Sequence, residues 1–211
     1  MERYYNSGYT KDEIINGLIS KNNFKKYLEI GVNNGDNFYK INCPHKISVD
    51  PVQNGATTHV MTSDKFFEDE RFQTTFDLIF IDGLHVADQC YRDMVNSINH
   101  LNDNGFIICH DMNPVTKIMT RPLSEFHDDG IPWTGDVYKA FVKFRQNYTQ
   151  FNSCLLYDCD YGLGVIMKTP TSVSVNIECD ADNLTFEEFS FNKNYLMNCV
   201  PTQEFVKNFI L

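Results

Sequence analysis

One stretch near the N-terminus, Lys26–Asn37, constrains the fold more than any other part of the chain. It begins with a short apolar run, Tyr27–Ile30, which predicts a buried strand, and it continues into a turn that contains Gly31 and Gly35. Glycine lets the backbone take positive φ angles and approach a ligand closely, which a Cβ atom would obstruct. A strand, a glycine-containing turn and a following helix are how open α/β sheets hold a nucleotide-like ligand. The stretch therefore predicts such a sheet, with a ligand at this turn.

Acidic residues around the turn restrict the ligand. A dinucleotide-binding turn uses Gly-x-Gly-x-x-Gly to bring a helix N-terminus against a pyrophosphate, but here the sixth position is Asp36, and Glu29 adds a second negative charge. Asp36 or Asn37 can instead cap the following helix. Asp50 ends a second predicted strand, Lys46–Val49, nineteen positions after the first glycine, near the spacing at which an acid meets ribose hydroxyls. A ligand with an amino group, a sulfonium and a ribose, such as S-adenosylmethionine, is compatible with these acids.

The composition argues against several classes of function. At 211 residues, the chain is long enough for one α/β domain and too short for two comfortable ones. The formal net charge of −10 and the pI of about 4.9 argue against nucleic acid, because phosphate binding needs clustered Lys and Arg. No apolar run reaches the roughly eighteen residues of a membrane span, and the N-terminus lacks a signal-peptide pattern. Seven scattered cysteines without Cys-x-x-Cys favour a reducing, cytoplasmic location.

Apolar runs predict further strands and helices along the chain. The run Phe76–Ile81 is the strongest strand signal and is predicted to be the central fourth strand. The other predicted elements are a helix over 10–21, a strand over 58–61, a helix from 63 or 64 to 70, a helix over 86–101, a strand over 105–109, a helix over 135–148, a hairpin of 154–157 with 163–167, a short strand over 173–177, and two helices that begin near 185 and 202. The segment 112–133, with three prolines, predicts a lid or binding loop.

Glu29, Gly31, Asn33 and Gly35 form a motif that resembles the first motif of the class I S-adenosylmethionine-dependent methyltransferases, an acid, any residue and then Gly-x-Gly-x-Gly. Asn33 replaces the middle glycine, and Asn tolerates left-handed backbone better than most residues. The resemblance implies a Rossmann-like, seven-stranded, mostly parallel sheet with an antiparallel C-terminal hairpin and helices on both faces. It also implies these cofactor-binding residues: Glu29, Gly31, Asn33, Gly35, Asp50, Ser63, Asp64, Asp82 and Gly83. Ser63 or Asp64 would meet the adenine, and the alternative that either is only a helix N-cap stays open.

Two predicted strands bring acids and histidines to the same edge of the sheet. Asp82 and His85 follow the strand over 76–81, and His110 and Asp111 follow the strand over 105–109. Methyl transfer to a hydroxyl needs a group that removes the acceptor's proton, and histidine suits this because its pKa lies near neutral. We expect His85 as the base, His110 as the second choice, and Asp111 beside them. The alternative is that His85 caps the next helix and His110 makes supporting hydrogen bonds.

The pattern Asp-Gly-x-His, followed by His-Asp, resembles a family of small methyltransferases related to those that act on sugar and antibiotic hydroxyls. Some relatives, including the catechol type, bind magnesium with acids at these two strand ends. The resemblance therefore implies Mg²⁺ as a candidate cofactor, with Asp82, His110 and Asp111 as ligands. The chain departs from the catechol type's Asp-Asn pair, because Met112 follows Asp111.

The sequence thus predicts an S-adenosylmethionine-dependent methyltransferase that acts on a hydroxyl of a sugar or another small molecule, by in-line transfer with a histidine base. A nucleotide-dependent oxidoreductase and a binding protein that kept the fold without turnover are the alternatives. The predicted parts are an N-terminal helical cap over 1–23, a methyltransferase core over 24–168 and an aromatic-rich extension over 169–211. The extension packs on the core or on a partner chain, as in a homodimer. No motif names the acceptor.

Overall fold

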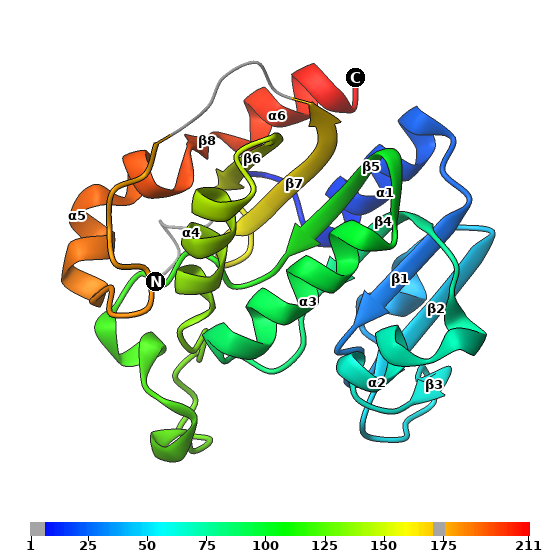
Figure 1. The fold of residues 1–211 in the computed structure, drawn as a ribbon, viewed down its shortest axis with the longest axis horizontal. Helices are drawn as coiled ribbons and strands as arrows, with labels where there is room; N and C mark the ends of the chain where they lie inside the picture. The colour runs from blue at the N-terminus through cyan, green and yellow to red at the C-terminus, as the bar shows by residue number, and fades with distance from the viewer. Residues whose placement is uncertain (1–6, 171–175) are drawn as a thin grey trace.

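The computed structural model describes residues 7–170 and 176–211, which form a mixed sheet with helices on both faces (Figure 1). The eight strands run in the order β3-β2-β1-β4-β5-β7-β6-β8. Their bounds are β1 Lys26–Ile30, β2 His45–Asp50, β3 His59–Val60, β4 Phe76–Ile81, β5 Leu101–Cys109, β6 Phe151–Leu156, β7 Leu163–Pro170 and β8 Cys199–Val200. The helices are α1 Lys11–Asn22, α2 Ser63–Glu68, α3 Ala87–Asn99, α4 Val137–Asn147, α5 Phe186–Met197 and α6 Thr202–Phe209.

The sheet confirms the predicted topology and adds one strand. Strands β1 to β5 pair in parallel, and β7 pairs antiparallel with both β5 and β6. The additional strand, β8, has two residues and pairs in parallel with the outer strand β6. It comes from the C-terminal extension, so this part of the chain continues the sheet.

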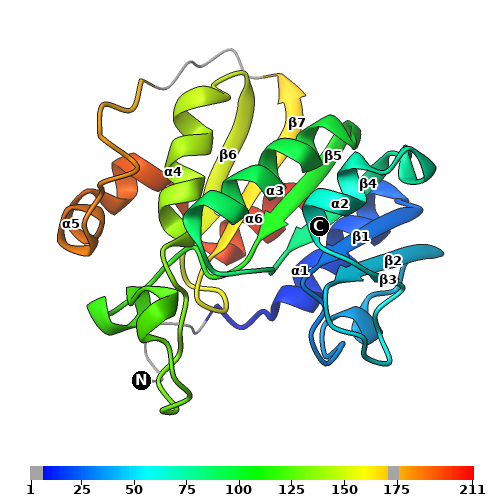
Figure 2. The ribbon, with the colours of Figure 1, turned by 60° about the horizontal axis from the view of Figure 1, so that its bottom comes forward.

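The alternation of side chains along β4 shows why this strand is central. Leu78 and Phe80 belong to one buried apolar cluster, and Ile79 and Ile81 belong to the other, on the opposite face of the sheet. Helices α1 and α6 cover the first face, whereas α2, α3 and α4 cover the second (Figures 1 and 2). A strand that is buried on both faces needs a continuous apolar run, which is why its sequence signal was strong.

The extension contributes to both faces. Phe205 and Val206 of α6 are buried in the cluster that also holds the apolar face of α1, and Phe189 of α5 is buried in the other cluster. The capping box at Thr185 is present, as predicted. Phe191 remains 90% exposed, and the homodimer stays a prediction. The predicted strand over 173–177 lies largely outside the described residues.

Two local predictions are wrong. The glycine turn is followed by a single 3-10 turn, η1 Phe38–Lys40, rather than by an α-helix, and no side chain caps it. The segment that joins β1 to β2 is short and includes Pro44, which restricts the residue before it, while the Asn37 side chain is drawn inward. The N-cap of α2 is Thr62, whose hydroxyl accepts from the Lys65 N–H, and not Ser63 or Asp64.

The segment between β5 and α4 forms a long loop, as predicted, with two short 3-10 turns, η3 Lys117–Thr120 and η4 Leu123–Glu125. We call residues 112–136 the lid; it projects past the ends of α3 and α4 in both views (Figures 1 and 2). Arg121 is buried within it and donates to Asp129 Oδ1 at 3.0 Å. Among the described residues, no helix is both long and apolar enough to cross a membrane.

Candidate active site

A cavity of about 590 Å³ opens at the carboxyl ends of β1, β2 and β4. Open α/β sheets bind ligands at this edge, where neighbouring connections leave to opposite faces. Nine of the predicted site residues line the cavity: Gly31, Asn33, Asp50, Ser63, Asp82, Gly83, His85, His110 and Asp111. Glu29, Gly35 and Asp64 do not line it.

The glycine turn joins three strand ends at one wall of the cavity. Gly31 has a φ of 80°, and a Cβ built on it would lie 2.1 Å from the Asp82 carbonyl oxygen, so only glycine fits between β1 and β4. Asn33 also takes a left-handed conformation, with a φ of 44°, so it adopts the backbone expected of the glycine that it replaces. Its N–H donates to Asp50 Oδ2 at 3.1 Å, which ties the turn to the end of β2.

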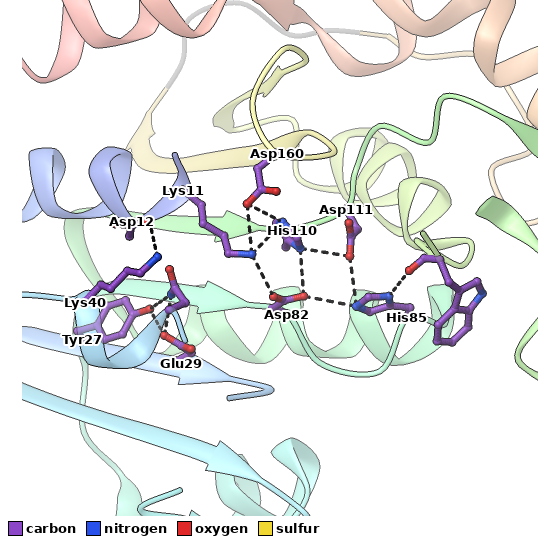
Figure 3. Close-up of polar contacts among 12 residues, drawn as sticks. Lys11, Asp12, Tyr27, Glu29, Lys40, Asp82, His85, His110, Asp111 and Asp160 are labelled. Atoms are coloured by element: carbon purple, nitrogen blue, oxygen red, sulfur yellow. Dashed lines mark hydrogen bonds and ion pairs between the residues drawn. The ribbon is translucent and has the colours of Figure 1, made fainter. Parts of the chain in front are cut away.

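Glu29 points away from the cavity, into the protein interior (Figure 3). Its carboxylate accepts from the Tyr27 hydroxyl at 2.5 Å and from Asn37 Nδ2 at 2.9 Å. Burial outweighs these hydrogen bonds and raises the pKa of Glu29 to about 7. Glu29 does not line the cavity, so its predicted contact with the cofactor stays a prediction. Its hydrogen bond to Asn37 holds the far side of the glycine turn in place.

Asp82, His85 and Asp111 face one another at the edge between β4 and β5 (Figure 3). His85 Nε2 lies 3.4 Å from Asp82 Oδ1 and 3.3 Å from Asp111 Oδ2. His85 Nδ1 lies 2.9 Å from the Trp133 carbonyl oxygen, which can only accept, so Nδ1 carries a hydrogen and Nε2 is the atom that gains or loses a proton. One ligand atom from each of the three residues lies within 4.8 Å of the others, a spacing that could hold a metal ion.

The pKa shifts of His85 and Asp82 follow from their neighbours. Burial by itself lowers the pKa of His85, but the hydrogen bond to Asp82 and the charges of Asp111 and Asp82 outweigh burial and raise it. Burial likewise raises the pKa of Asp82, yet the charge and hydrogen bond of His110, with His85 and Lys11, hold it well below its usual range. Asp82 is therefore ionised, and His85 is a stronger base than an isolated histidine.

His110 is enclosed by carboxylates on both ring nitrogens. Nδ1 lies 3.2 Å from both Asp82 Oδ1 and Asp111 Oδ2, and Nε2 lies 3.3 Å from Asp160 Oδ2. Burial opposes the charged form, but the carboxylates outweigh it and raise the pKa of His110 well above its usual value. Carboxylates therefore face both ring nitrogens of His110 but only Nε2 of His85, and the pKa of His110 is raised more strongly than that of His85.

Lys11, at the start of α1, completes this cluster. Its Nζ lies 3.2 Å from Asp160 Oδ2 and 4.0 Å from Asp82 Oδ2. We call Lys11, Asp82, His85, His110, Asp111 and Asp160 the strand-end cluster. In it, three acids face one lysine and two histidines, so the cations offset the carboxylates (Figure 3).

The lid holds His85 from the opposite side. Gly135 has a φ of 58°, and a Cβ built on it would lie 1.8 Å from the His85 carbonyl oxygen. The ring of Trp133 lies 5.2 Å from the His85 ring, centroid to centroid. The Ala87 N–H at the start of α3 donates to Asp136 Oδ1 at 2.7 Å, so His85 does not cap that helix. Glycine at 135 thus lets the end of the lid pack directly on the loop that carries His85.

The sequence reasoning missed three residues of this region. Lys11 and Asp160 come from segments far from β4 and β5 in the sequence, and no local signal marks them. Asp93 lines the cavity from α3, and here a signal existed, because an acid at position 93 lies on the apolar stripe of Cys90 and Met94.

Comparisons with known proteins agree with this architecture. Residues 33–112 match the family model described as a methyltransferase domain. No curated protein matches the chain. The structure is similar to the O-methyltransferase of Bacillus cereus in complex with S-adenosylhomocysteine, at 12% identity over 75% of this chain and 80% of that chain, with a TM-score of 0.55.

Two further solved structures are similar. For the O-methyltransferase TomG from Streptomyces achromogenes, involved in tomaymycin synthesis and in complex with S-adenosylmethionine, identity is 11% over 74% of this chain and 78% of that chain, with a TM-score of 0.54. For an S-adenosylhomocysteine-bound methyltransferase from Podospora anserina, identity is 16% over 74% and 76%, with a TM-score of 0.53. Residues 33–112 therefore resemble a methyltransferase domain, and the chain has the fold of these S-adenosylmethionine-dependent methyltransferases.

Proposed function

We propose that this chain transfers a methyl group from S-adenosylmethionine to a hydroxyl of a small molecule, sugars included. The observation that carries the proposal is the placement of His85 Nε2, between two carboxylates and on the wall of the same cavity as the glycine turn. A base at this place can reach a hydroxyl that enters the same cavity.

The wall of the cavity suits the proposed cofactor. Asp50 Oδ2 accepts from Asn33 N–H and Oδ1 accepts from Val52 N–H at 2.8 Å, so each oxygen keeps a lone pair for a ribose hydroxyl. The ionised Asp82 favours a cationic group near the end of β4. When bound, S-adenosylmethionine supplies an electrophilic methyl group on its sulfonium. Asp50 and Asp82 would thus orient the cofactor between β2 and β4.

His85 would act as the general base. The Trp133 carbonyl fixes its tautomer, so the lone pair of the neutral ring is on Nε2. Taking the acceptor's proton makes an imidazolium, which Asp82 and Asp111 stabilise because they lie within 3.4 Å and 3.3 Å of Nε2. The lid, through Trp133 and Gly135, holds the ring in this orientation.

A divalent cation is the second candidate for the same atoms. The favouring observation is the proximity of ligand atoms from Asp82, His85 and Asp111, a carboxylate and imidazole set that suits a divalent ion. In this set His85 replaces His110, which was the histidine ligand predicted from the sequence. A bound metal would lower the pKa of the acceptor hydroxyl and orient it. The two uses of His85 Nε2 exclude each other, which makes them separable by experiment.

The proposal is tested by isothermal titration calorimetry on metal-stripped protein. We expect S-adenosylmethionine to bind with micromolar affinity and NADH not to bind. Binding of NADH alone would favour the oxidoreductase, and binding of neither would contradict the enzyme as proposed. Cofactor binding without methyl transfer to any hydroxyl compound would favour the non-catalytic alternative.

The metal is tested separately, by titrating Mn²⁺ and following its electron paramagnetic resonance signal. If the cation is used, Asp111→Asn weakens Mn²⁺ binding by about tenfold or more, since a charged ligand is lost. Asp103→Asn, an exposed substitution elsewhere, serves as the control. Equal Mn²⁺ binding by wild type and Asp111→Asn removes the metal site and leaves His85 as the base.

A further inference from the structure

Arg121 is a buried arginine inside the lid. Its side chain is only 4% exposed, although residues 112–136 form a loop whose regular structure consists of two short 3-10 turns. A loop of this kind has few backbone hydrogen bonds of its own, so its conformation depends on the side chains that join its segments. Arg121 does not line the cavity, so its role must be sought in the parts of the lid that it holds.

The guanidinium of Arg121 joins two segments of the lid, the turn η3 and residues 126–129. Nη1 donates to the Ile118 carbonyl oxygen at 3.1 Å, and Nη2 donates to the His127 carbonyl oxygen at 3.3 Å and to Asp129 Oδ1 at 3.0 Å. Cζ also lies 5.6 Å from the centroid of the Phe126 ring. A guanidinium presents its donors in a fixed, planar fork and can therefore hold several acceptors in one arrangement.

A third segment of the lid, residues 133–135, is bound to the same turn. Trp133 Nε1 donates to the Arg121 carbonyl oxygen at 2.8 Å, and its ring stacks on the Phe126 ring with 4.4 Å between the centroids. The Thr134 N–H donates to the Met119 carbonyl oxygen at 3.0 Å. The position of Trp133 therefore depends on the turn η3 and on Arg121, which directly follows it.

The peptide bond between Trp133 and Thr134 transmits this arrangement to His85. Its N–H donates to the Met119 carbonyl oxygen. Its C=O lies 2.9 Å from His85 Nδ1, which carries a hydrogen and donates to it. Because a peptide bond is planar, the direction of its N–H fixes the direction of its C=O. The turn η3 thus sets the orientation of the carbonyl that His85 meets.

We propose that Arg121 is a positioning residue for His85, because it holds the lid in the conformation in which the Trp133 carbonyl orients the imidazole ring. The inference rests on the proposed function, in which His85 is the base. Since Arg121 does not line the cavity, its removal should leave the cofactor site intact. The His85 ring would then lose the hydrogen bond that fixes its tautomer, and Nε2 would be aligned with the acceptor for a smaller fraction of the time.

The hydrogen on His85 Nδ1 gives a direct test. This hydrogen is present both in the Nδ1–H tautomer of the neutral ring and in the imidazolium, so its NMR signal reports the hydrogen bond to Trp133 whatever the charge of the ring. Wild type and Arg121→Ala are compared with their histidines labelled with nitrogen-15, and the signal is assigned by its absence in His85→Ala. We expect the Nδ1–H signal to be protected from exchange with water in wild type and to be lost by exchange in Arg121→Ala.

Turnover and cofactor affinity separate a positioning role from a general loss of structure. We expect Arg121→Ala to lower kcat by roughly 10- to 100-fold, the effect of a small misplacement of a reacting group, with KM for S-adenosylmethionine and the affinity for S-adenosylhomocysteine nearly unchanged. Arg71→Ala is the matched control, because Arg71 also pairs with an aspartate but is 76% exposed and lies outside the lid. It should keep the Nδ1–H signal and the kcat of wild type.

Chemical rescue tests whether the guanidinium itself is the group that matters. N-ethylguanidinium has the groups that Arg121→Ala removes, so adding it should restore part of the signal and part of kcat. Ethylammonium has the charge without the planar fork and should restore neither. Arg121→Lys covers the case in which Arg121→Ala does not fold. It keeps the charge and loses the fork, so we expect the same losses to a smaller degree.

The outcomes distinguish this inference from the proposed function. An Nδ1–H signal that is the same in wild type and in the Arg121 variants overturns the inference, and so does a lost signal with normal kcat. Both results leave methyl transfer by wild type as proposed. Wild type without methyl transfer overturns the proposed function instead, and the Nδ1–H signal by itself then decides whether Arg121 holds His85.

Discussion

Asp82 and Asp93 both line the cavity, but the groups that face them differ. Asp82 lies among His85, His110 and Lys11, and it is ionised because these cations outweigh the cost of burial. Asp93 has an amide and a hydroxyl as partners, and burial raises its pKa to about 6. One end of the cavity is therefore suited to charge and proton transfer, and the other to directional hydrogen bonds.

Glu29 extends the comparison to the interior behind the glycine turn. Like Asp93 it has only neutral hydrogen-bond partners, Tyr27 and Asn37, and its pKa is raised to about 7. Side-chain carboxyl groups in this part of the protein thus have pKa values shifted in opposite directions, up for Glu29 and Asp93 and down for Asp82. The difference shows that the partner, and not burial alone, decides whether a carboxylate here is charged.

The largest expected effect tests the end of the cavity where Asp82 and His85 lie. We expect His85→Ala to lower turnover by about 10²- to 10⁴-fold, the usual share of a general base, with cofactor affinity nearly unchanged. Because the pKa of His85 is raised, kcat/KM of wild type should rise with pH along a limb above the usual histidine range, as the ring loses its proton. Turnover is measured as S-adenosylhomocysteine release, with an acceptor found by screening hydroxyl compounds.

His45→Ala, an exposed histidine substitution, is the matched control for this measurement. It should leave both turnover and the pH profile as in wild type. If His85→Ala keeps normal turnover, His85 has no part in the mechanism, and the chemistry must be sought among the other residues of the strand-end cluster.

The second largest effect concerns Glu29, whose hydrogen-bond partners are neutral side chains. A raised pKa means that folded Glu29 holds its proton more tightly than the unfolded chain, so its contribution to stability is present at low pH and is lost as pH rises from about 4.5 to about 7. The shift corresponds to about 3 kcal/mol. Glu29→Gln mimics the neutral acid, so it should lose this pH dependence and be the more stable protein above pH 7. Urea unfolding at several pH values measures it.

Glu68→Gln, an exposed change of the same kind, should keep the pH dependence of wild type. An identical slope of unfolding free energy against pH in Glu29→Gln and wild type would show that Glu29 is ionised in the folded protein. The contrast between acids with cationic partners and acids with neutral ones would then disappear for this residue.

The smallest expected effect concerns Asp160, whose pKa is lowered, whereas that of Glu29 is raised. Burial alone would raise the pKa of Asp160, but the hydrogen bond and charge of His110, together with Lys11, outweigh burial and lower it to about 2. Its contribution to stability is therefore present above its unfolded pKa and is lost as pH falls through about 2. With 34% of the side chain exposed, solvent screening reduces the value to about 1 kcal/mol.

Asp160→Asn is the suitable variant, because the residue has a φ of 40° and Asn tolerates that backbone. We expect the variant to be about 1 kcal/mol less stable than wild type at pH 7, and the difference to vanish as pH approaches 2. Thermal and urea unfolding across this range measure it. A difference that does not change with pH would mean that Asp160 acts through packing and not through its charge.

Much of the fold could be predicted because the signals are local. The apolar run over 76–81 marked a strand buried on both faces, and the capping box at Thr185 marked the start of α5. The helix expected after the glycine turn was wrong, since the inward hydrogen bond of Asn37 and the nearby Pro44 outweighed the local pattern. Asp93 could have been found from its place on the apolar stripe of α3.

The sequence alone determined which residues reach the cavity edge. Asp50, Asp82, His85, His110 and Asp111 all follow apolar strands, and parallel strands end at one edge, so their proximity follows from short-range patterns. Only the tertiary structure decided what each one faces. His110 meets Lys11 from 99 positions earlier in the chain, and the lid's Trp133 carbonyl fixes the tautomer of His85. Such partners depend on how distant segments pack, and the pKa shifts of Asp82 and His85 follow from these partners.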